Sequence, residues 1–244
     1  MKILVLGHKG MLGSMVMDYF NYQKYFNKKD YYDIRICTTR FGDKHFAEAI
    51  NNFQADVIIN CIGAIPQTSK TFQVNTDLPI WLSNNVTAKV VHPGTDCEMD
   101  ADAYGTSKRI ASDYIKLYSK NTKILKTSIV GPENGTANGL MAWLGAQTGT
   151  VKGYTGAIWN GNTTLEWCKQ AEDLILNWDN YSTETILEAP PISKYDMLKL
   201  FQQYYGNDVV IEPVELGKNK CLRGTIKTKH LSEQLEDLKQ FLII

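Results

Sequence analysis

Two residues spaced four apart could carry out acid–base chemistry at a carbonyl group. Tyr104 and Lys108 begin a segment with a helical pattern, and this spacing places both side chains on one helix face. A nearby ammonium favours a phenolate, so Lys108 is expected to lower the pKa of Tyr104 from its usual value of about 10. Tyr104 could then give a proton to a carbonyl oxygen while a hydride reaches the carbon. Because any helix can carry this pair by chance, the pair alone does not identify a site.

A third candidate residue precedes this pair at the end of a short apolar run. Thr95 follows the run at 89–91, which is typical of a buried strand. Doubly wound sheets bind their ligands at the carboxyl ends of strands. The Thr95 hydroxyl could therefore hold a substrate carbonyl.

Three regularly spaced glycines follow the first apolar run. Gly7, Gly10 and Gly13 lie between a strand expected at 3–6 and a helix expected at 11–26. The first glycine permits a tight turn, the second lets backbone N–H groups approach a pyrophosphate, and the third lets helix and strand pack closely. The helix N-terminus would then direct its partial positive charge at the phosphates. The loop residues predicted to contact a dinucleotide are Gly7, Lys9, Gly10, Met11, Leu12 and Gly13.

The end of the second expected strand bears on which dinucleotide binds. Thr39 and Arg40 stand there, where an NAD site usually has an Asp or Glu that holds the ribose 2′-hydroxyl. A guanidinium suits a 2′-phosphate, whereas a carboxylate would repel one. Together with Lys9 in the glycine loop, these residues favour NADP over NAD as the cofactor. The alternative is that Arg40 is a solvated surface charge.

The elements that must position these residues alternate between short apolar runs and longer helical patterns. Strands are expected at 3–6, 34–37, 57–60, 89–91 and 123–125, and helices at 11–26, 46–53, 74–85 and 103–119. Such alternation implies right-handed crossovers and a parallel sheet with helices on both faces. We therefore predict an α/β fold with a doubly wound, Rossmann-like parallel sheet of six or seven strands. Residues 1–130 would form the dinucleotide-binding domain.

The pattern changes after about residue 130, where Gly, Asn and Thr are dense. Helical patterns return at 164–177, 194–205 and 231–241. We interpret residues 131–244 as a small C-terminal substrate-binding lobe that is interleaved with the sheet edge, so that the chain forms one integrated unit. Segments near 151–165 and 184–190 are candidates for a further strand at that edge.

Composition argues against several classes of function. Lys and Arg total 26 and Asp and Glu total 26, so no basic excess is available for nucleic acid or an anionic membrane. No apolar run approaches the roughly 20 residues of a membrane span. The five cysteines and four histidines show no metal-ligand spacing, so no metal is expected, and an odd, unpatterned set of cysteines suits a reducing compartment. Because the first residues are too short and too strand-like for a signal peptide, we expect a cytoplasmic protein.

The glycine loop, the strand-end threonine and the Tyr104/Lys108 pair occur in the order typical of extended short-chain dehydrogenase/reductases. The sequence resembles most closely the dTDP-4-dehydrorhamnose reductase family. The resemblance covers most of the chain, and the segments that carry it are 56–63, 74–79, 94–96, 125–131 and 159–164.

This resemblance implies an NADPH-dependent reductase of the C4 keto group of a nucleoside-diphosphate 4-keto-6-deoxyhexose, in rhamnose-type nucleotide-sugar biosynthesis. The implied catalytic residues are Thr95, Tyr104 and Lys108, of which Lys108 would also hold the nicotinamide ribose. The implied cofactor contacts after the third strand are Cys61, Ile62, Gly63 and Ala64, and the implied substrate contacts are Thr95, Asp96, Trp159 and Asn160. A homodimer formed through the helices at 74–85 and 103–119 is also expected.

Two departures from the family pattern leave alternatives open. Only eight residues separate Thr95 from Tyr104, whereas relatives carry a longer loop there that helps to cover the sugar. Cys97 stands where bifunctional epimerase/reductases carry an acid–base cysteine, but the segment 140–143 offers no His or Lys as its partner base. Cys97 could instead pack as a small hydrophobe. The alternatives are therefore a 3-epimerase/4-reductase of a UDP- or dTDP-ketosugar that uses Cys97, and a catalytically silent NADP-binding regulatory subunit.

Overall fold

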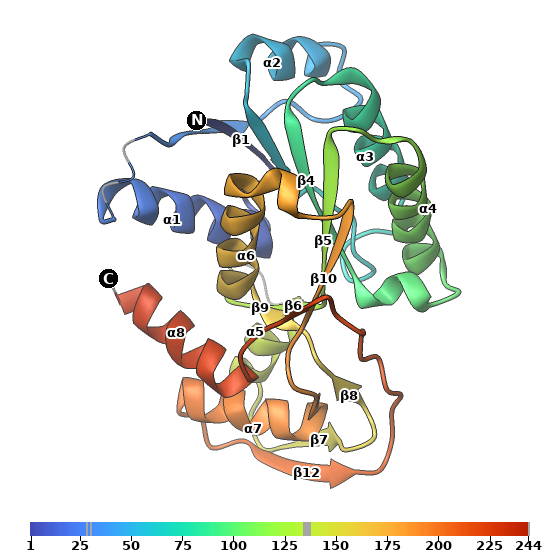
Figure 1. Ribbon diagram of the computed structural model, residues 1–244. Coiled ribbons are helices and arrows are strands. Elements are labelled where there is room, and N and C mark those ends of the chain that lie inside the picture. Colours follow the sequence, from blue (N-terminus) through green and yellow to red (C-terminus); the bar gives the residue numbers. More distant parts are fainter. Residues whose placement is uncertain (28, 30, 134–137, 244) are drawn as a thin grey trace.

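A parallel sheet with helices on both faces forms the centre of the protein (Figure 1). The computed structural model describes residues 1–27, 29, 31–133 and 138–243, and among these residues the sheet has seven strands in the order β13-β10-β5-β4-β3-β1-β2. The strands are β1 (Lys2–Leu6), β2 (Asp33–Cys37), β3 (Val57–Asn60), β4 (Lys89–Gly94), β5 (Thr122–Lys126), β10 (Glu184–Glu188) and β13 (Ile226–Lys227). The predicted α/β, doubly wound fold is thereby confirmed.

Two layers of helices cover the faces of the sheet. Helices α1 (Met11–Tyr25) and α6 (Thr164–Leu176) cover one face, and α2 (Phe46–Phe53), α3 (Val74–Asn85) and α4 (Ala103–Tyr118) cover the other (Figure 1). The apolar strand β1 serves both layers, because successive side chains of a strand point to opposite faces. Ile3 and Val5 join the core under α1 and α6, whereas Leu4 and Leu6 join the core under α2 and α3.

The strand order creates a crevice at the carboxyl edge of the sheet. β1 pairs with β2 on one side and with β3 on the other, so the chain leaves β1 in one direction and later returns past it. In open α/β sheets, ligands bind at such a reversal point, beyond the carboxyl ends of the strands. The loops after β1, β2, β3 and β4 all begin at this edge.

The second half of the chain contributes both to the sheet and to a lobe beyond its carboxyl edge. The further strand expected near 184–190 is present, since β10 extends the sheet beyond β5, although β13 and not β10 forms the edge. The expectation for 151–165 is wrong, because β7 (Thr150–Tyr154) pairs instead with β12 (Val210–Val214) in the lobe. Five strands of the sheet therefore come from residues 1–130 and two from beyond them. The domain boundary near residue 130 stays a prediction.

The remaining elements build this lobe, which lies below the sheet in Figure 1. Helix α7 packs on both β7 and β12 and also contacts α5 and α8. The elements are β6 (Ile129–Val130), α5 (Leu140–Gly145), β8 (Ile158–Trp159), β9 (Asn162–Thr163), β11 (Ile192–Ser193), α7 (Lys194–Tyr205) and α8 (Leu231–Ile243). None of the helices in the described ranges is long and apolar enough to cross a membrane.

A buried carboxylate joins the two halves of the chain. Glu172 of α6 accepts hydrogen bonds from the hydroxyls of Tyr19 at 2.7 Å and Tyr32 at 2.6 Å, and pairs with Lys29 at 2.7 Å. Burial, followed by the adjacent Glu172 carboxylate, raises the pKa of both tyrosines. This network fixes α6 against α1, and thus fixes the start of the lobe relative to the glycine loop.

Candidate active site

The glycine loop connects β1 to α1 in a conformation that requires at least two of its glycines. Gly7 has a φ of +78°, and a Cβ atom there would lie 2.8 Å from backbone atoms of Cys61 and Ile62. A Cβ atom on Gly13 would lie 2.1 Å from the Gly7 carbonyl oxygen. Gly10 is the N-cap of α1, and no side chain makes a capping hydrogen bond there. The first N–H groups of α1 therefore remain available to an anion at the helix N-terminus.

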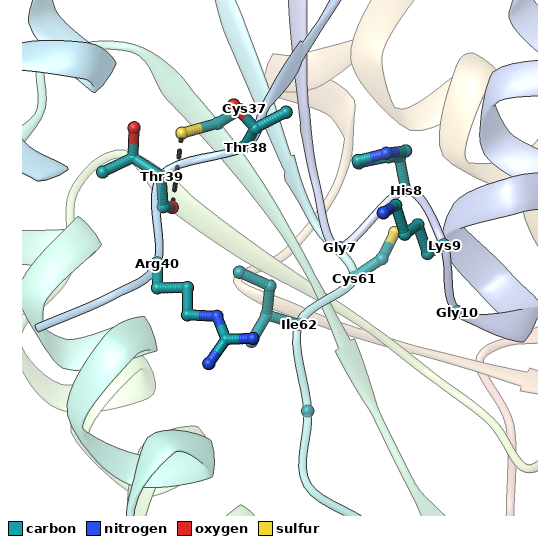
Figure 2. Close-up of a pocket in the computed structure, with 11 residues that line it drawn as sticks. Gly7, His8, Lys9, Gly10, Cys37, Thr38, Thr39, Arg40, Cys61 and Ile62 are labelled. Atoms are coloured by element: carbon teal, nitrogen blue, oxygen red, sulfur yellow. Dashed lines mark hydrogen bonds between the residues drawn. The ribbon is translucent and has the colours of Figure 1, made fainter. Parts of the chain in front are cut away.

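A cavity of about 420 Å³ lies between this loop and the ends of β2 and β3 (Figure 2). Thr39 and Arg40 line one side of it and the Gly7–Gly10 loop lines the other, with the Arg40 side chain extending toward Ile62. Within the described part of the chain, no carboxylate pairs with the Arg40 guanidinium. The cavity therefore offers an unneutralised cation where an adenosine ribose would lie in a dinucleotide site of this kind.

A second cavity, of about 350 Å³, continues along the carboxyl edge of the sheet. It shares Lys9, Gly10 and Cys61–Gly63 with the first cavity, so the two are contiguous. Thr95, Tyr104 and Lys108 line it together, although they come from the end of β4 and from α4. The structure thus brings together the three residues that sequence reasoning had singled out for chemistry, and Met11, Leu12, Ile62 and Gly63 lie beside them.

Lys108 is buried at the base of this cavity. Its Nζ donates a hydrogen bond to the Pro93 carbonyl oxygen at 2.9 Å and lies 3.5 Å from His92 Nε2. Burial lowers the pKa of Lys108 to about 8, and the Glu98 carboxylate opposes this shift. Lys108 can therefore gain or lose a proton close to neutral pH.

The pKa of Tyr104 differs from the sequence-based expectation. Burial raises it, and the neighbouring Cys97, Asp96, Glu98 and Asp102 raise it further. The expectation that Lys108 lowers it is wrong in this structure, because Nζ of Lys108 is directed at the Pro93 carbonyl. The Tyr104 phenol is thus protonated at neutral pH. The Phe72 ring packs edge-on against the Tyr104 ring, with 5.6 Å between the two ring centroids.

A capping box fixes the backbone around Thr95. Thr95 caps the short 3₁₀ helix Asp96–Met99, accepting the Cys97 N–H at 3.3 Å, and its own N–H donates to Glu98 Oε1 at 3.0 Å. The other Glu98 oxygen pairs with Lys126 of β5 at 2.6 Å. The Thr95 hydroxyl lies 3.1 Å from Asp96 Oδ1. The Thr-x-x-Glu signature is visible in the sequence and could have predicted this cap.

A third cavity, of about 440 Å³, extends from the second into the lobe. Met11 lines both, and Asp96, Cys97 and Trp159 line the third. Burial, followed by Asp96, raises the pKa of the Cys97 thiol to about 11, and the Lys220 ammonium opposes this shift. The three cavities together form one groove from the end of β2 to the lobe.

Comparisons with known proteins identify the fold. No family model matches the sequence, and no curated protein matches it. A dTDP-4-dehydrorhamnose reductase from Clostridium acetobutylicum is similar over 100% of both chains, at 20% identity and a TM-score of 0.75. The chain shares the fold of this reductase.

Two further solved structures agree with this result. A dTDP-4-dehydrorhamnose reductase from Bacillus anthracis, in complex with NADP, matches at 18% identity and a TM-score of 0.76 over 99% of this chain and 98% of its own. A GDP-mannoheptose C4 reductase from Campylobacter jejuni with NADP bound matches at 12% identity and a TM-score of 0.68 over 100% and 98%.

Within this fold, some predicted contacts lie outside the groove. The implied substrate contact of Asn160 is not supported, because its buried amide bonds the backbone N–H and carbonyl of Leu222 at 2.9 and 2.7 Å. Ala64 does not line the cavities described above, and Asn75 bonds its backbone N–H at 2.7 Å and its carbonyl at 2.9 Å. The side-chain amides of Asn75 and Asn160 thus hold neighbouring segments in place.

Sequence reasoning also missed several residues that line the lobe cavity. Three lysines and one aromatic residue reach it from distant parts of the chain: Lys194, Lys218, Lys220 and Tyr154. Lys220 pairs with Asp100 at 2.5 Å. The pair of lysines after Gly217 was a weak signal of a basic loop, but nothing local showed which surface that loop faces. Among the described residues, no group of three or more His, Cys, Asp and Glu could hold a metal ion.

Proposed function

We propose that the protein is an NADPH-dependent reductase of the C4 keto group of a nucleoside-diphosphate 4-keto-6-deoxyhexose. The observation that carries this proposal is the continuous groove. Its glycine-loop end suits a dinucleotide, its middle holds Thr95, Tyr104 and Lys108, and its far end opens into the lobe. The compared reductases of nucleotide sugars support the same assignment through their shared fold.

The residues present fit NADP. Close packing of Gly7 and Gly13 leaves the loop backbone open to a pyrophosphate, while Arg40 and Lys9 supply cations for a 2′-phosphate. Cys61–Gly63 and Lys108 would line the nicotinamide end. NADPH bound along this groove supplies the hydride.

The chain's own residues supply the proton and the orientation. Because the Tyr104 phenol is protonated at neutral pH, it can donate to a carbonyl oxygen as negative charge develops there. Lys108 lines the same cavity, and with its pKa lowered to about 8 it can return a proton to the phenolate after turning from the Pro93 carbonyl. Thr95 is held in place by its capping box, so its hydroxyl can orient the carbonyl after turning from Asp96.

The lobe cavity supports a nucleotide-linked sugar as the substrate. Lys194, Lys218 and Lys220 line it, and lysines are frequent partners of phosphate groups. Trp159 and Tyr154 line the same cavity and present rings on which a sugar or a base can pack. A diphosphate in this cavity would place the attached sugar toward Cys97 and the catalytic residues.

The test is NADPH oxidation with dTDP-, UDP- and GDP-4-keto-6-deoxyhexoses. Tyr104→Phe should lower kcat about a hundred- to ten-thousand-fold, the range typical of a lost general acid, while NADPH affinity stays nearly unchanged. Tyr114→Phe is the matched control, because Tyr114 lies on the same helix and its hydroxyl bonds Asn84 at 2.9 Å. If Tyr104→Phe keeps more than about a tenth of the wild-type kcat in a chemistry-limited assay, the assignment of the acid is wrong.

One observation favours a second candidate, a bifunctional 3-epimerase/4-reductase. Cys97 and Lys220 line the same cavity, and each affects the pKa of the other. Lys220 is therefore available as the second acid–base group that an epimerase needs and that the segment 140–143 does not provide. The raised pKa of Cys97 keeps its thiol neutral and supports the plain reductase. Solvent deuterium that enters C3 or C5 of the product would identify the epimerase. A silent regulatory subunit would bind NADPH and oxidise it with none of the ketosugars.

We also propose a homodimer formed through α3 and α4. Three large apolar side chains on α4 are exposed: Ile110 at 48%, Leu117 at 72% and Tyr118 at 67%. Burying such surface in a two-fold contact is favourable. Light scattering that shows only monomer at micromolar concentration would contradict this proposal.

A further inference from the structure

A buried histidine lies beside Lys108 and has no role in the reaction proposed above. His92 belongs to β4 and is 1% exposed. Its Nε2 lies 3.5 Å from Lys108 Nζ, and its Nδ1 lies 3.3 Å from Nδ2 of Asn60, the last residue of β3. The imidazole therefore connects the end of β3 to α4, the helix that carries Tyr104 and Lys108.

The hydrogen bonds of Asn60 select one tautomer of His92. Asn60 Oδ1 accepts the Ile62 N–H at 3.2 Å, which turns Nδ2 toward His92. An amide nitrogen only donates, so His92 Nδ1 must accept. Burial and the adjacent Lys108 lower the pKa of His92, so the ring is neutral and carries its single proton on Nε2. This Nε2–H is directed at Lys108.

A donor at this position discriminates between the two forms of Lys108. The ammonium has only donors, so it would meet the imidazole N–H donor to donor. The amine has a lone pair that can accept from Nε2–H while one of its own hydrogens still bonds the Pro93 carbonyl at 2.9 Å. We propose that His92 is a positioning residue, which holds Lys108 at the Pro93 carbonyl and favours its uncharged amine through an Nε2–H donor selected by Asn60.

Other groups that face Lys108 come from three neighbouring elements. Burial is the largest influence on its pKa, Glu98 of the 3₁₀ helix and Cys61 after β3 raise it, and Lys126 of β5 lowers it. None of these groups lies between Lys108 and His92 in the hydrogen-bond chain. The consequence for catalysis rests on the proposed function: by stabilising the amine, His92 lowers the pKa of the Lys108 ammonium, which makes that ammonium a stronger acid toward the Tyr104 phenolate.

The tautomer can be measured without any substrate. The chain has only four histidines, so ¹⁵N NMR of labelled protein gives few imidazole signals, and loss of one in His92→Asn assigns His92. We expect a neutral Nε2–H tautomer that does not titrate around neutral pH. An Nδ1–H tautomer, or an imidazolium at neutral pH, would overturn the proposal.

The titration of Lys108 tests the contact itself. In His92→Asn, the shorter amide can still accept from Asn60, but nothing takes the place of Nε2–H. The ¹³C signal of the Lys108 ε-carbon, assigned with Lys108→Arg, should therefore titrate about half a unit to one unit higher in pH than in wild type. His45→Asn, at an exposed position, should leave this midpoint unchanged. An unchanged or lower midpoint in His92→Asn would refute the proposal.

A second variant covers the case in which His92→Asn does not fold. His92→Gln reaches the position of Nε2 and can present its carbonyl oxygen to the ammonium, so the same upward shift is expected and its absence would refute the proposal. In the reductase assay, the basic limb of kcat/KM against pH should move with the Lys108 midpoint. A merely structural role would lower kcat at every pH without moving that limb. If no ketosugar is reduced, the proposed function fails, whereas the two NMR results still decide the role of His92.

Discussion

Alanine substitutions at Gly10 and Gly13 should separate ligand binding from folding in the glycine loop. At Gly13, the new Cβ would lie 2.1 Å from the Gly7 oxygen, 2.7 Å from the Gly7 carbonyl carbon and 2.9 Å from His8 Cα. These are backbone atoms, so α1 must move away from β1 to relieve the overlap. Overpacking of this kind typically costs about 1–3 kcal/mol. At about 2–4 °C per kcal/mol for a domain of this size, Tm should fall by roughly 2–12 °C.

At Gly10, the same substitution meets no obstacle in the protein. The nearest atom to the new Cβ would be the Gly7 oxygen at 3.6 Å, and the φ of −78° suits any residue. Loss of a glycine N-cap should cost at most about 1 kcal/mol. The methyl group does stand where a pyrophosphate would approach the loop, and one lost charge-assisted hydrogen bond of about 1.5–3 kcal/mol weakens binding roughly ten- to a hundredfold.

Two measurements on each variant separate its effect on folding from its effect on NADPH binding. Thermal or denaturant unfolding of the protein alone gives stability, and calorimetric titration with NADPH gives Kd. Gly10→Ala should keep its stability and lose affinity, whereas Gly13→Ala should lose both. The reasoning is refuted if Gly13→Ala is as stable as wild type, or if Gly10→Ala is destabilised as much as Gly13→Ala.

Three further predictions concern single side chains. Arg40→Ala should narrow the gap between the Kd values for NADPH and NADH, and equal affinities in the unmutated protein would contradict the cofactor assignment. Cys97→Ser should leave the kcat of a plain reductase within a few-fold of wild type, whereas an epimerase would lose deuterium exchange at C3 or C5. Lys108→Met should raise the free energy of unfolding at pH 7 by about 1–3 kcal/mol although it abolishes activity. Folding lowers the pKa of Lys108 from 10.5 to about 8, so the unfolded chain binds this proton more tightly than the folded protein does. The free energy of unfolding of the wild type should therefore rise as the pH increases from about 8 to 10.5. If Lys108→Met shows the same rise, the prediction is contradicted.

The positions of the central elements followed from the sequence because their signals are local. β1 and β3 are short apolar runs buried on both faces, and α1 and α4 repeat apolar residues at helical spacing. The glycine loop could be recognised for the same reason, since its spacing lies within seven residues, and the positive φ of Gly7 and the contact of Gly13 with the Gly7 carbonyl both arise within the loop. The spacing of Tyr104 and Lys108 likewise placed both side chains on one face of α4.

What only the tertiary structure decided depends on residues that meet across long stretches of chain. Lys220 reaches the lobe cavity and pairs with Asp100, 120 residues away, and no local pattern brings that loop to the groove. The pKa of Tyr104 is raised, although the helical spacing to Lys108 predicted the opposite. The reason is that burial and the direction of Lys108 toward Pro93 and His92 are set by the packing of α4 on β4. Sequence spacing shows which side chains share a face, whereas the charge that each one carries depends on the solvent and the partners that folding leaves to it.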